Sequence, residues 1–202
     1  KSKRQKAYSL AHWTVHTDNL SIEDVVSEVI HGCELLNVSL IKEDPLAGSL
    51  ATTVHTAQES YPVYVDIGLM DKVGLSVKKL GLDSTAYVLA DEAVFFKYGR
   101  KLHQSLETVG IPTHIFTFPS GEKSKSIDIA SKAYRWLADL KAERGHFVIG
   151  LGGGVVGDIA GFVASTYGRG MSFVQVPTTL LSMVDASIGG KTAVNLPEGK
   201  NL

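Results

Sequence analysis

Gly150-Leu151-Gly152-Gly153-Gly154-Val155-Val156-Gly157-Asp158 is the stretch of this chain that decides its fold. It follows an apolar run at residues 147–149, which predicts a buried strand, and precedes a second run at 159–164, which predicts a tightly packed helix. In that context it satisfies G-x-G-x-x-G, where glycines allow a sharp turn and the close approach of a phosphate to a helix N-terminus. Two interpretations are open: a cradle for a pyrophosphate, or a glycine-rich turn that packs a helix onto a sheet.

The overall composition narrows the class of protein. The chain has 202 residues, of which 44% are hydrophobic and 20% charged, so we expect a packed core and little disorder. A net charge of −1 argues against general binding to nucleic acid or to a membrane surface. The single cysteine, Cys33, excludes an internal disulfide and a cysteine-cluster metal site, and fits a reducing, cytoplasmic setting. No signal peptide or membrane span is predicted.

A regular alternation of strands and helices begins at Leu50. Helices are predicted at 69–80, 93–109 and 126–140, and strands at 51–56, 61–65, 85–89, 113–118, 146–151 and 172–176. This alternation predicts an α/β fold, with a Rossmann-like, mostly parallel sheet covered by helices on both faces. Ligands of such folds bind at the carboxyl ends of strands, where Asp91, Glu122, 152–158 and 177–179 all lie. This convergence favours the nucleotide interpretation of the glycine stretch.

Residues 175–192 form a second stretch whose residue types could bind a ligand or take part in catalysis. It ends in Gly190-Lys191-Thr192, which is like the tail of a Walker phosphate loop. The first glycine of such a loop would fall on Asp185, whose carboxylate would oppose a triphosphate, so we reject a P-loop. Asp185 and Lys191 then form either a surface salt bridge, which the residues alone slightly favour, or part of a site for an anionic ligand.

Residues 195–201 form a third stretch, in which Pro197 and Gly199 predict a turn. Taken alone, Lys200 is typical of a solvated charge in such a turn. None of the seven histidines has a metal-ligand spacing such as H-E-x-x-H, so the sequence itself predicts no metal ligand.

Taken together, these motifs closely resemble 3-dehydroquinate synthase. They are the glycine stretch, Tyr167-Gly168-Arg169-Gly170, Val-Pro-Thr-Thr-Leu-Leu, Val-Asp-Ala-Ser-Ile-Gly-Gly-Lys-Thr and Pro-Glu-Gly-Lys-Asn, and the resemblance runs from about Leu50 to Leu202. It implies the amino-terminal, NAD-binding domain of a phosphate-eliminating lyase of the shikimate pathway. That enzyme converts the sugar phosphate 3-deoxy-D-arabino-heptulosonate 7-phosphate to 3-dehydroquinate and phosphate, with NAD and a divalent metal (zinc or cobalt), as a homodimer.

The resemblance also assigns roles to residues. It implies cofactor binding by Asp91, Glu122, Lys125, Gly152, Gly153, Gly154, Val155, Asp158, Thr178 and Thr179. It implies catalysis or substrate binding by Asp185, Lys191, Lys200 and Asn201, with Arg169 reaching the substrate phosphate of the neighbouring subunit. Ala93 departs from the family, which often has an asparagine there, two residues after the ribose-binding acid. The family's helical second domain and its metal ligands, one glutamate and two histidines, would follow Leu202, so we expect this chain alone to bind NAD without turnover.

Residues 1–40 predict a separate small unit. Ser21 and Asp24 form a capping box before an amphipathic helix. Residues 4–40, and above all the phrase at 8–21, loosely resemble the carboxyl-terminal end of a shikimate kinase, its last strand and helix. This implies the remnant of a fusion that carries nothing catalytic. Residues 41–49 predict a linker. The chain begins without methionine and stops without a cap, so we expect a piece of a longer polypeptide.

Three alternative functions are left open. Related cyclases, such as 2-epi-5-epi-valiolone synthase and 2-deoxy-scyllo-inosose synthase, share this first domain, although Lys200-Asn201 favours dehydroquinate synthase. Metal-dependent alcohol and glycerol dehydrogenases have a similar glycine turn and Pro-Thr-Thr, but usually continue with a Thr-Gly-Ser-Glu-like sequence that this chain lacks. The third alternative is a non-catalytic NAD-binding or dimerisation module.

Overall fold

The computed structural model describes residues 21–28, 46, 48–56 and 60–202. The chain divides into two compact units, Lys1–Ala47 and Gly48–Leu202. In the first unit residues 22–28 are helical. The Asp24 amide donates to Ser21 Oγ (3.1 Å) and the Ser21 amide donates to Asp24 Oδ2 (3.1 Å), which confirms the predicted capping box. The shikimate kinase-like phrase up to residue 20 and most of the predicted linker lie outside the described residues.

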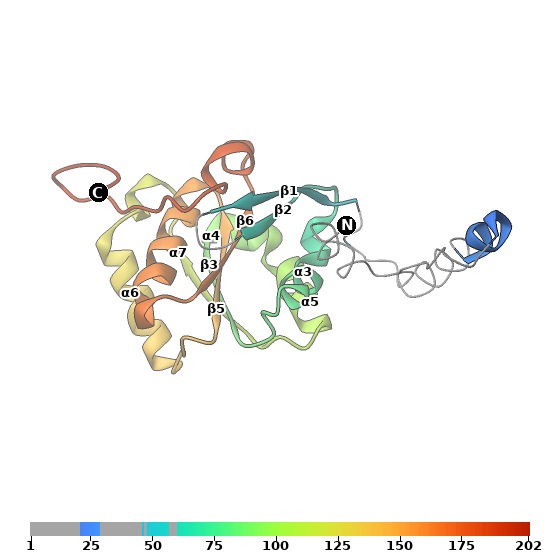
Figure 1. Cartoon of the computed structure of the whole chain (residues 1–202). Coiled ribbons are helices and arrows are strands. Elements are labelled where there is room, and N and C mark those ends of the chain that lie inside the picture. The colour runs from blue at the N-terminus through green and yellow to red at the C-terminus, as the bar shows by residue number, and fades with distance from the viewer. Residues whose placement is uncertain (1–20, 29–45, 47, 57–59) are drawn as a thin grey trace. The chain divides into compact units, whose positions relative to one another are not determined.

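The second unit is built on a four-stranded parallel sheet (Figure 1). Its order is β4-β3-β5-β6, with β3 at Ala86–Asp91, β4 at Thr113–Phe118, β5 at Phe147–Gly152 and β6 at Ser172–Pro177. Every neighbouring pair is parallel and in continuous register. All six residues of β5 are buried, as expected for a central strand covered on both faces. The predicted α/β fold is therefore confirmed.

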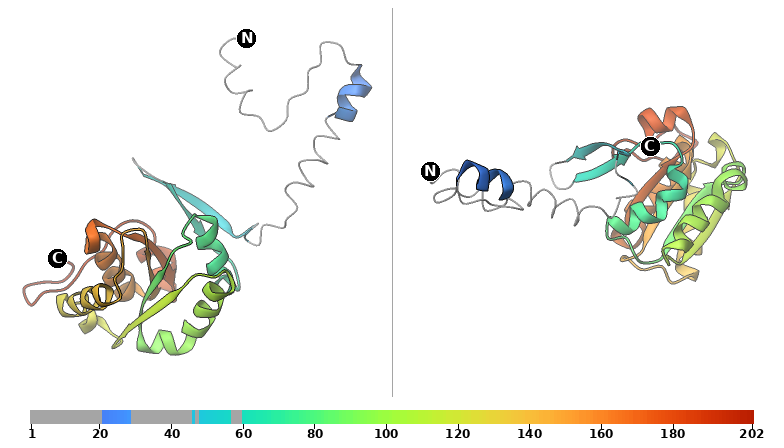
Figure 2. Two further views of the ribbon diagram at one scale, coloured as in Figure 1. Left: turned by 90° about the horizontal axis from the view of Figure 1, so that it is seen from below. Right: turned by 90° about the vertical axis from the view of Figure 1, so that its right-hand side faces the viewer.

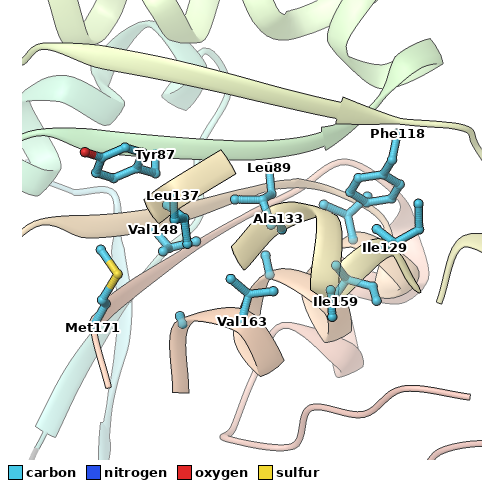
Figure 3. Close-up of a cluster of buried hydrophobic side chains, with 14 of the residues drawn as sticks. Tyr87, Leu89, Phe118, Ile129, Ala133, Leu137, Val148, Ile159, Val163 and Met171 are labelled. Carbon is cyan, nitrogen blue, oxygen red and sulfur yellow. The ribbon is translucent and has the colours of Figure 1, made fainter. Parts of the chain in front are cut away.

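Helices cover both faces of this sheet (Figure 2). On one face, α3 (Val73–Lys79) and α5 (Arg100–Thr108) pack on the side chains of Val88 and Ile149. On the other, α6 (Ile127–Asp139) and α7 (Gly154–Thr166) pack on Tyr87 and Val148 (Figure 3). Successive strand residues point to opposite faces, so each strand supplies both cores.

Several short turns complete the unit. The helix predicted at 93–109 begins as α4 (Glu92–Val94), passes through a wide π turn, η2 (Phe95–Gly99), and continues as α5. The other turns are η1 (Leu69–Lys72), η3 (Glu122–Ser124), η4 (Tyr167–Arg169) and the π-helical η5 (Ser182–Ala186). No described helix is long and apolar enough to cross a membrane.

The first two strands stand apart from the parallel sheet. Among the described strands, β1 (Leu50–His55) and β2 (Ser60–Tyr64) pair with each other alone, as an antiparallel ribbon. Residues 56–59 alone connect them in the sequence. A parallel pair needs a crossover of about a dozen residues or more, so this connection allows only the antiparallel arrangement.

Glycine residues at the contact between α7 and the sheet allow the helix to lie close to the strands. A Cβ on Gly152 of β5 would lie 2.4 Å from Val156 Cγ2 of α7. A Cβ on Gly161 of α7 would lie 3.1 Å from Phe173 Cε1 of β6, and 2.3 Å from Thr192 Cγ2 in the segment that follows η5. Helix α7 begins at Gly154, so the expectation that 152–158 form a turn and the helix starts at 159 is wrong. Glycine and valine favour helices weakly, which hid the first turn of α7, but packing against the sheet overrides that preference.

We predict that Gly152→Ala lowers the free energy of unfolding by about 1–3 kcal/mol, because the new methyl group overfills the contact with Val156. Gly145→Ala is the matched control, since a Cβ there meets nothing within 4 Å. The control should change stability by less than about 1 kcal/mol. Urea unfolding measures both values, and equal stabilities for the two variants would contradict the packing role of Gly152.

Candidate functional site

The first turn of α7 offers a binding surface for an anion. Gly153 is the N-cap of α7 and supplies no side-chain cap, so the positive end of this helix dipole is open. A Cβ on Gly154 would meet one atom outside its own helix within 4 Å, Ala186 Cβ at 3.7 Å. A Cβ on Gly153 would press on Thr179 Cγ2 at 3.0 Å. Gly152 and Gly153 are therefore needed for packing, and Gly154 is the glycine that a ligand can approach.

Two threonines follow β6 beside this turn. The Thr178 amide donates to the Gly152 carbonyl oxygen (2.9 Å), which joins the two strand ends. Thr179 caps the helix that includes η5, because its Oγ1 accepts from the Ser182 amide (3.2 Å). Thr178 Oγ1 is buried and has no partner among the described residues. A buried hydroxyl without a partner is costly, so this atom is available to a water molecule or to a polar group of a ligand.

A polar network lies next to α7 and joins three segments of the chain. The Lys125 side chain is buried, and its ammonium group contacts both the Asp158 carboxylate on α7 and Asn201 Oδ1. Asn195 Nδ2 donates to Glu122 Oε1 (2.7 Å). The structure thus brings together Glu122, Lys125, Asp158 and Asn201, all of which the family resemblance assigned to the site.

A surface pocket of about 660 Å³ opens beside this network. Its walls come from the loop before α6 and from the turn near the end of the chain, and they include Glu122, Lys125, Asn195 and Lys200. The turn predicted by Pro197 and Gly199 is present, since Leu196 and Gly199 exchange backbone hydrogen bonds of 2.9 and 3.1 Å. The lining carries three lysines, Lys123, Lys125 and Lys200, against two carboxylates, Glu122 and Asp128. This mixture of charges suits a polar ligand that bears both hydroxyl and anionic groups.

Asp91 lies at the carboxyl end of β3 and has a structural task. Its Oδ1 accepts from the Val94 amide (2.9 Å) and from Ser120 Oγ (2.8 Å). It therefore caps α4 and ties the end of β3 to the loop after β4. Oδ2 receives no hydrogen bond from any described residue. That second oxygen is free to accept from the hydroxyl group of a ligand.

The predicted substrate residues are exposed. Asp185 lies in η5, and Lys191 and Lys200 lie in the segment that follows it. Within the described residues, Asp185 and Lys191 form no ion pair, so the surface salt bridge that the sequence slightly favoured is absent. No helix follows Lys191, which agrees with the rejection of a P-loop.

Arg169 lies far from the other predicted residues of the same chain. It follows α7, so it sits at the amino edge of the sheet, whereas Gly154 begins α7 at the carboxyl edge. The 13 residues of α7 separate the two positions by about 20 Å at 1.5 Å per residue. Arg169 is exposed and has a left-handed backbone (φ 66°). This geometry separates Arg169 from the site of its own chain.

Two residues that the sequence did not single out support the predicted ones. Asn195 contacts Lys125, Glu122 and Asn201 through three hydrogen bonds. Tyr61 of the β1–β2 ribbon accepts a hydrogen bond at its hydroxyl from the Gly189 amide (2.8 Å), two residues before Lys191. Both bridge segments that are far apart in the chain, and no local pattern signals such contacts. The described residues contain no cluster of three or more His, Cys, Asp or Glu side chains that could hold a metal ion, so we assign none of them to a metal.

Comparisons with known proteins find similar sequences and similar structures. Residues 115–202 match the family described as 3-dehydroquinate synthase N-terminal. The chain is 47% identical over 150 residues to 3-dehydroquinate synthase of Enterococcus faecalis, and 49% identical over 146 residues to that of Symbiobacterium thermophilum. These matches cover 74% and 72% of the chain, but 42% and 41% of the two relatives. The chain thus spans less than half the length of the curated relatives that it matches.

Solved structures of related enzymes share the fold. One is a 2-deoxy-scyllo-inosose synthase complexed with carbaglucose-6-phosphate, NAD⁺ and Co²⁺ (TM-score 0.69, 25% identity, covering 75% of this chain and 41% of that one). Another is a 2-epi-5-epi-valiolone synthase from Streptomyces hygroscopicus with NAD⁺ and Zn²⁺ bound (TM-score 0.63, 30% identity, covering 74% and 41%).

We predict that Lys125→Met lowers the free energy of unfolding by about 3 kcal/mol, because it leaves the Asp158 carboxylate unpaired. This value is at the lower end for a broken buried pair, since Asp158 keeps 25% of its side-chain surface exposed. Adding Asp158→Asn should recover part of the loss. Lys123→Met, at an exposed lysine nearby, is the control, and urea unfolding is the measurement. An unfolding free energy for Lys125→Met equal to that of the control would show that the ion pair does not stabilise the fold.

Proposed function

Since residues 115–202 match the N-terminal region of the 3-dehydroquinate synthase family, we propose that this chain is the NAD-binding part of a 3-dehydroquinate synthase. The observation that carries the proposal is 42–49% identity to eight curated enzymes of that name over about three quarters of the chain. The reaction is the conversion of 3-deoxy-D-arabino-heptulosonate 7-phosphate to 3-dehydroquinate and phosphate. The single cysteine fits a reducing compartment, and we propose the cytoplasm.

The residues at the carboxyl edge of the sheet fit the cofactor. The uncapped N-terminus of α7 suits a pyrophosphate, and Gly154 leaves room for it to approach the backbone. The unpartnered Thr178 hydroxyl can bond to a polar group of the same ligand. Asp91 Oδ2 can accept from a ribose hydroxyl. NAD in this place would supply the reversible oxidation of a substrate hydroxyl, which acidifies the neighbouring C–H.

The exposed charged residues are proposed to face the substrate. Lys191 and Lys200 can pair with its carboxylate and phosphate, and Asn201 can hydrogen-bond to it through the side-chain atoms that Lys125 leaves free. Asp185, close to Gly154 through Ala186, can accept from a substrate hydroxyl. The work of these residues is to bind and orient a charged sugar beside the cofactor. A divalent metal is expected for the enzyme as a whole, and no step is assigned to it because no described residues fit it.

A related sugar-phosphate cyclase is the second candidate. The two cyclases with solved structures are 25% and 30% identical to this chain, with NAD⁺ in both crystals. The curated dehydroquinate synthases are more similar, at 42–49%. The difference favours dehydroquinate synthase. Product analysis with the two kinds of sugar phosphate, using the natural full-length polypeptide, separates these functions.

We also propose a homodimer in which Arg169 completes the site of the partner subunit. The position of Arg169 at the amino edge of the sheet supports this, because the arginine cannot reach Gly154 of its own chain. An exposed guanidinium with no ion-pair partner among the described residues is available to a phosphate on another subunit.

We predict that Gly154→Val weakens NAD binding to the 202-residue chain by at least about tenfold, because the side chain occupies the approach to the helix N-terminus. Gly145→Val is the matched control, at a glycine with open space around it and remote from the site. Isothermal titration calorimetry measures both affinities, and thermal unfolding shows that both variants are folded. Equal NAD affinities for the two variants would rule out Gly154 as part of the cradle.

We predict partial recovery of turnover when Arg169→Ala and Lys191→Ala protomers are mixed in the full-length enzyme. Each homodimer lacks one essential group in both sites, but a mixed dimer has one intact site if Arg169 acts across the interface. Random mixing should restore about a quarter of wild-type activity, since half of the dimers are mixed and half of their sites are intact. Activity that stays at the level of the two homodimers would place Arg169 in its own chain's site or outside any site.

A further inference from the structure

Asn195 lies between the loop before α6 and the last residues of the chain. Its backbone amide donates to the Lys125 carbonyl oxygen (2.8 Å) and its Nδ2 donates to Glu122 Oε1 (2.7 Å). Its Oδ1 accepts from the Asn201 amide (2.9 Å). One half-buried side chain therefore bonds to a residue proposed for the cofactor and to a residue proposed for the substrate.

These contacts close a ring. Asn195 bonds to Lys125, the Lys125 ammonium group contacts Asn201 Oδ1, and the Asn201 amide returns to Asn195. Asn201 has a left-handed backbone (φ 58°), which asparagine tolerates better than most residues. The ring holds this conformation and so sets the direction in which Lys200 and Asn201 leave the turn.

The turn itself does not need the Asn195 side chain. Leu196 and Gly199 close it with their own backbone hydrogen bonds, and the Leu202 amide donates to the Val194 carbonyl oxygen (3.0 Å). What the Asn195 side chain adds is the connection from this turn to Glu122. A residue with a purely local role would make no such contact across 73 positions of sequence.

We propose that Asn195 is a positioning residue that couples occupancy of the cofactor site to the placement of Lys200 and Asn201. A cofactor that engages Glu122 and Lys125 restrains two of the residues to which Asn195 is hydrogen-bonded. Asn195 passes this restraint to Lys200 and Asn201. The inference rests on the proposed function, because it takes NAD as the ligand of Glu122 and Lys125. The role assigned to Asn195 is exerted through Glu122, Lys125 and Asn201, to which it is hydrogen-bonded.

The test is amide hydrogen exchange of the 202-residue chain with and without saturating NAD. In the wild type, NAD should slow exchange in residues 196–202 by about two- to tenfold, the range for one net hydrogen bond. In Asn195→Ala this NAD-dependent protection should disappear while NAD still binds. Glu198→Ala, at an exposed position of the same turn, is the matched control and should behave as wild type.

A second pair of variants separates the link to Glu122 from general loosening of the turn. Asn195→Asp keeps the acceptor for Asn201 but removes the donor to Glu122 and sets two carboxylates against each other. Its NAD-dependent protection should be lost. The double variant Asn195→Asp with Glu122→Gln should regain the protection, because the amide introduced at position 122 supplies the missing donor. Because Glu122 is itself proposed to bind the cofactor, each variant is compared at an NAD concentration that calorimetry shows to saturate it. A merely structural role would change exchange equally with and without NAD.

The outcomes distinguish the two proposals. If the wild-type chain does not bind NAD in calorimetry, the proposed cofactor site fails and the coupling fails with it. If NAD binds but residues 196–202 exchange at the same rate with and without it, the coupling through Asn195 is wrong and the cofactor site stands. Protection that persists in Asn195→Ala would also overturn the role of Asn195.

Discussion

The close contact of α7 with β5 and β6 is the constraint on which the rest of the structure depends. Gly152 and Gly161 have no side chain to hold the helix away, so its N-terminus lies next to the Thr178 backbone at the carboxyl edge of the sheet. The same placement brings Asp158, on the inner part of α7, to the Lys125 ammonium group. If one added methyl group displaced the helix outward, its N-terminus would move away from Thr178 and Asp158 would move away from Lys125. Close-packed side chains leave no slack to compensate for such a shift.

The buried lysine is the second determinant of the site. An ammonium group removed from water is costly, and the Asp158 carboxylate and the Asn201 amide oxygen offset that cost together. A loop, a helix and the last residues of the chain therefore share one charge. This shared charge explains how an exposed segment without regular structure has a defined position at the edge of the sheet. It also places polar groups with unused bonding capacity beside the open N-terminus of α7.

Sequence reasoning located most of the fold because the signals there were local. The Asp91 cap and the left-handed Gly110 bound the helix between them, and alternation of apolar runs predicted the parallel sheet. Sequence reasoning placed the start of α7 too late in the chain, because the low helix propensity of glycine and valine argued against a helix there. Packing against the sheet, which exists only in the folded chain, overrides that propensity. Sequence reasoning found Lys125 and Asn201 through a family resemblance, but not Asn195 or Tyr61. Their contacts join segments 73 and 128 residues apart, and one sequence carries no periodic trace of such pairs.

Some glycines of this region are required for packing and others for the approach of a ligand, and this difference affects how the motif is interpreted in other chains. Gly152, Gly157 and Gly161 face Val156, Gln175 and Thr192, so their small size is demanded by the architecture whether or not a nucleotide ever binds. A related protein that no longer bound the cofactor but kept the fold would retain these three glycines. It would therefore still show two of the three glycines of the G-x-G-x-x-G motif, Gly152 and Gly157. Gly154 and the Thr178 hydroxyl are free of that demand. In a sequence of this architecture, they are the positions at which loss of the ancestral chemistry would first be visible.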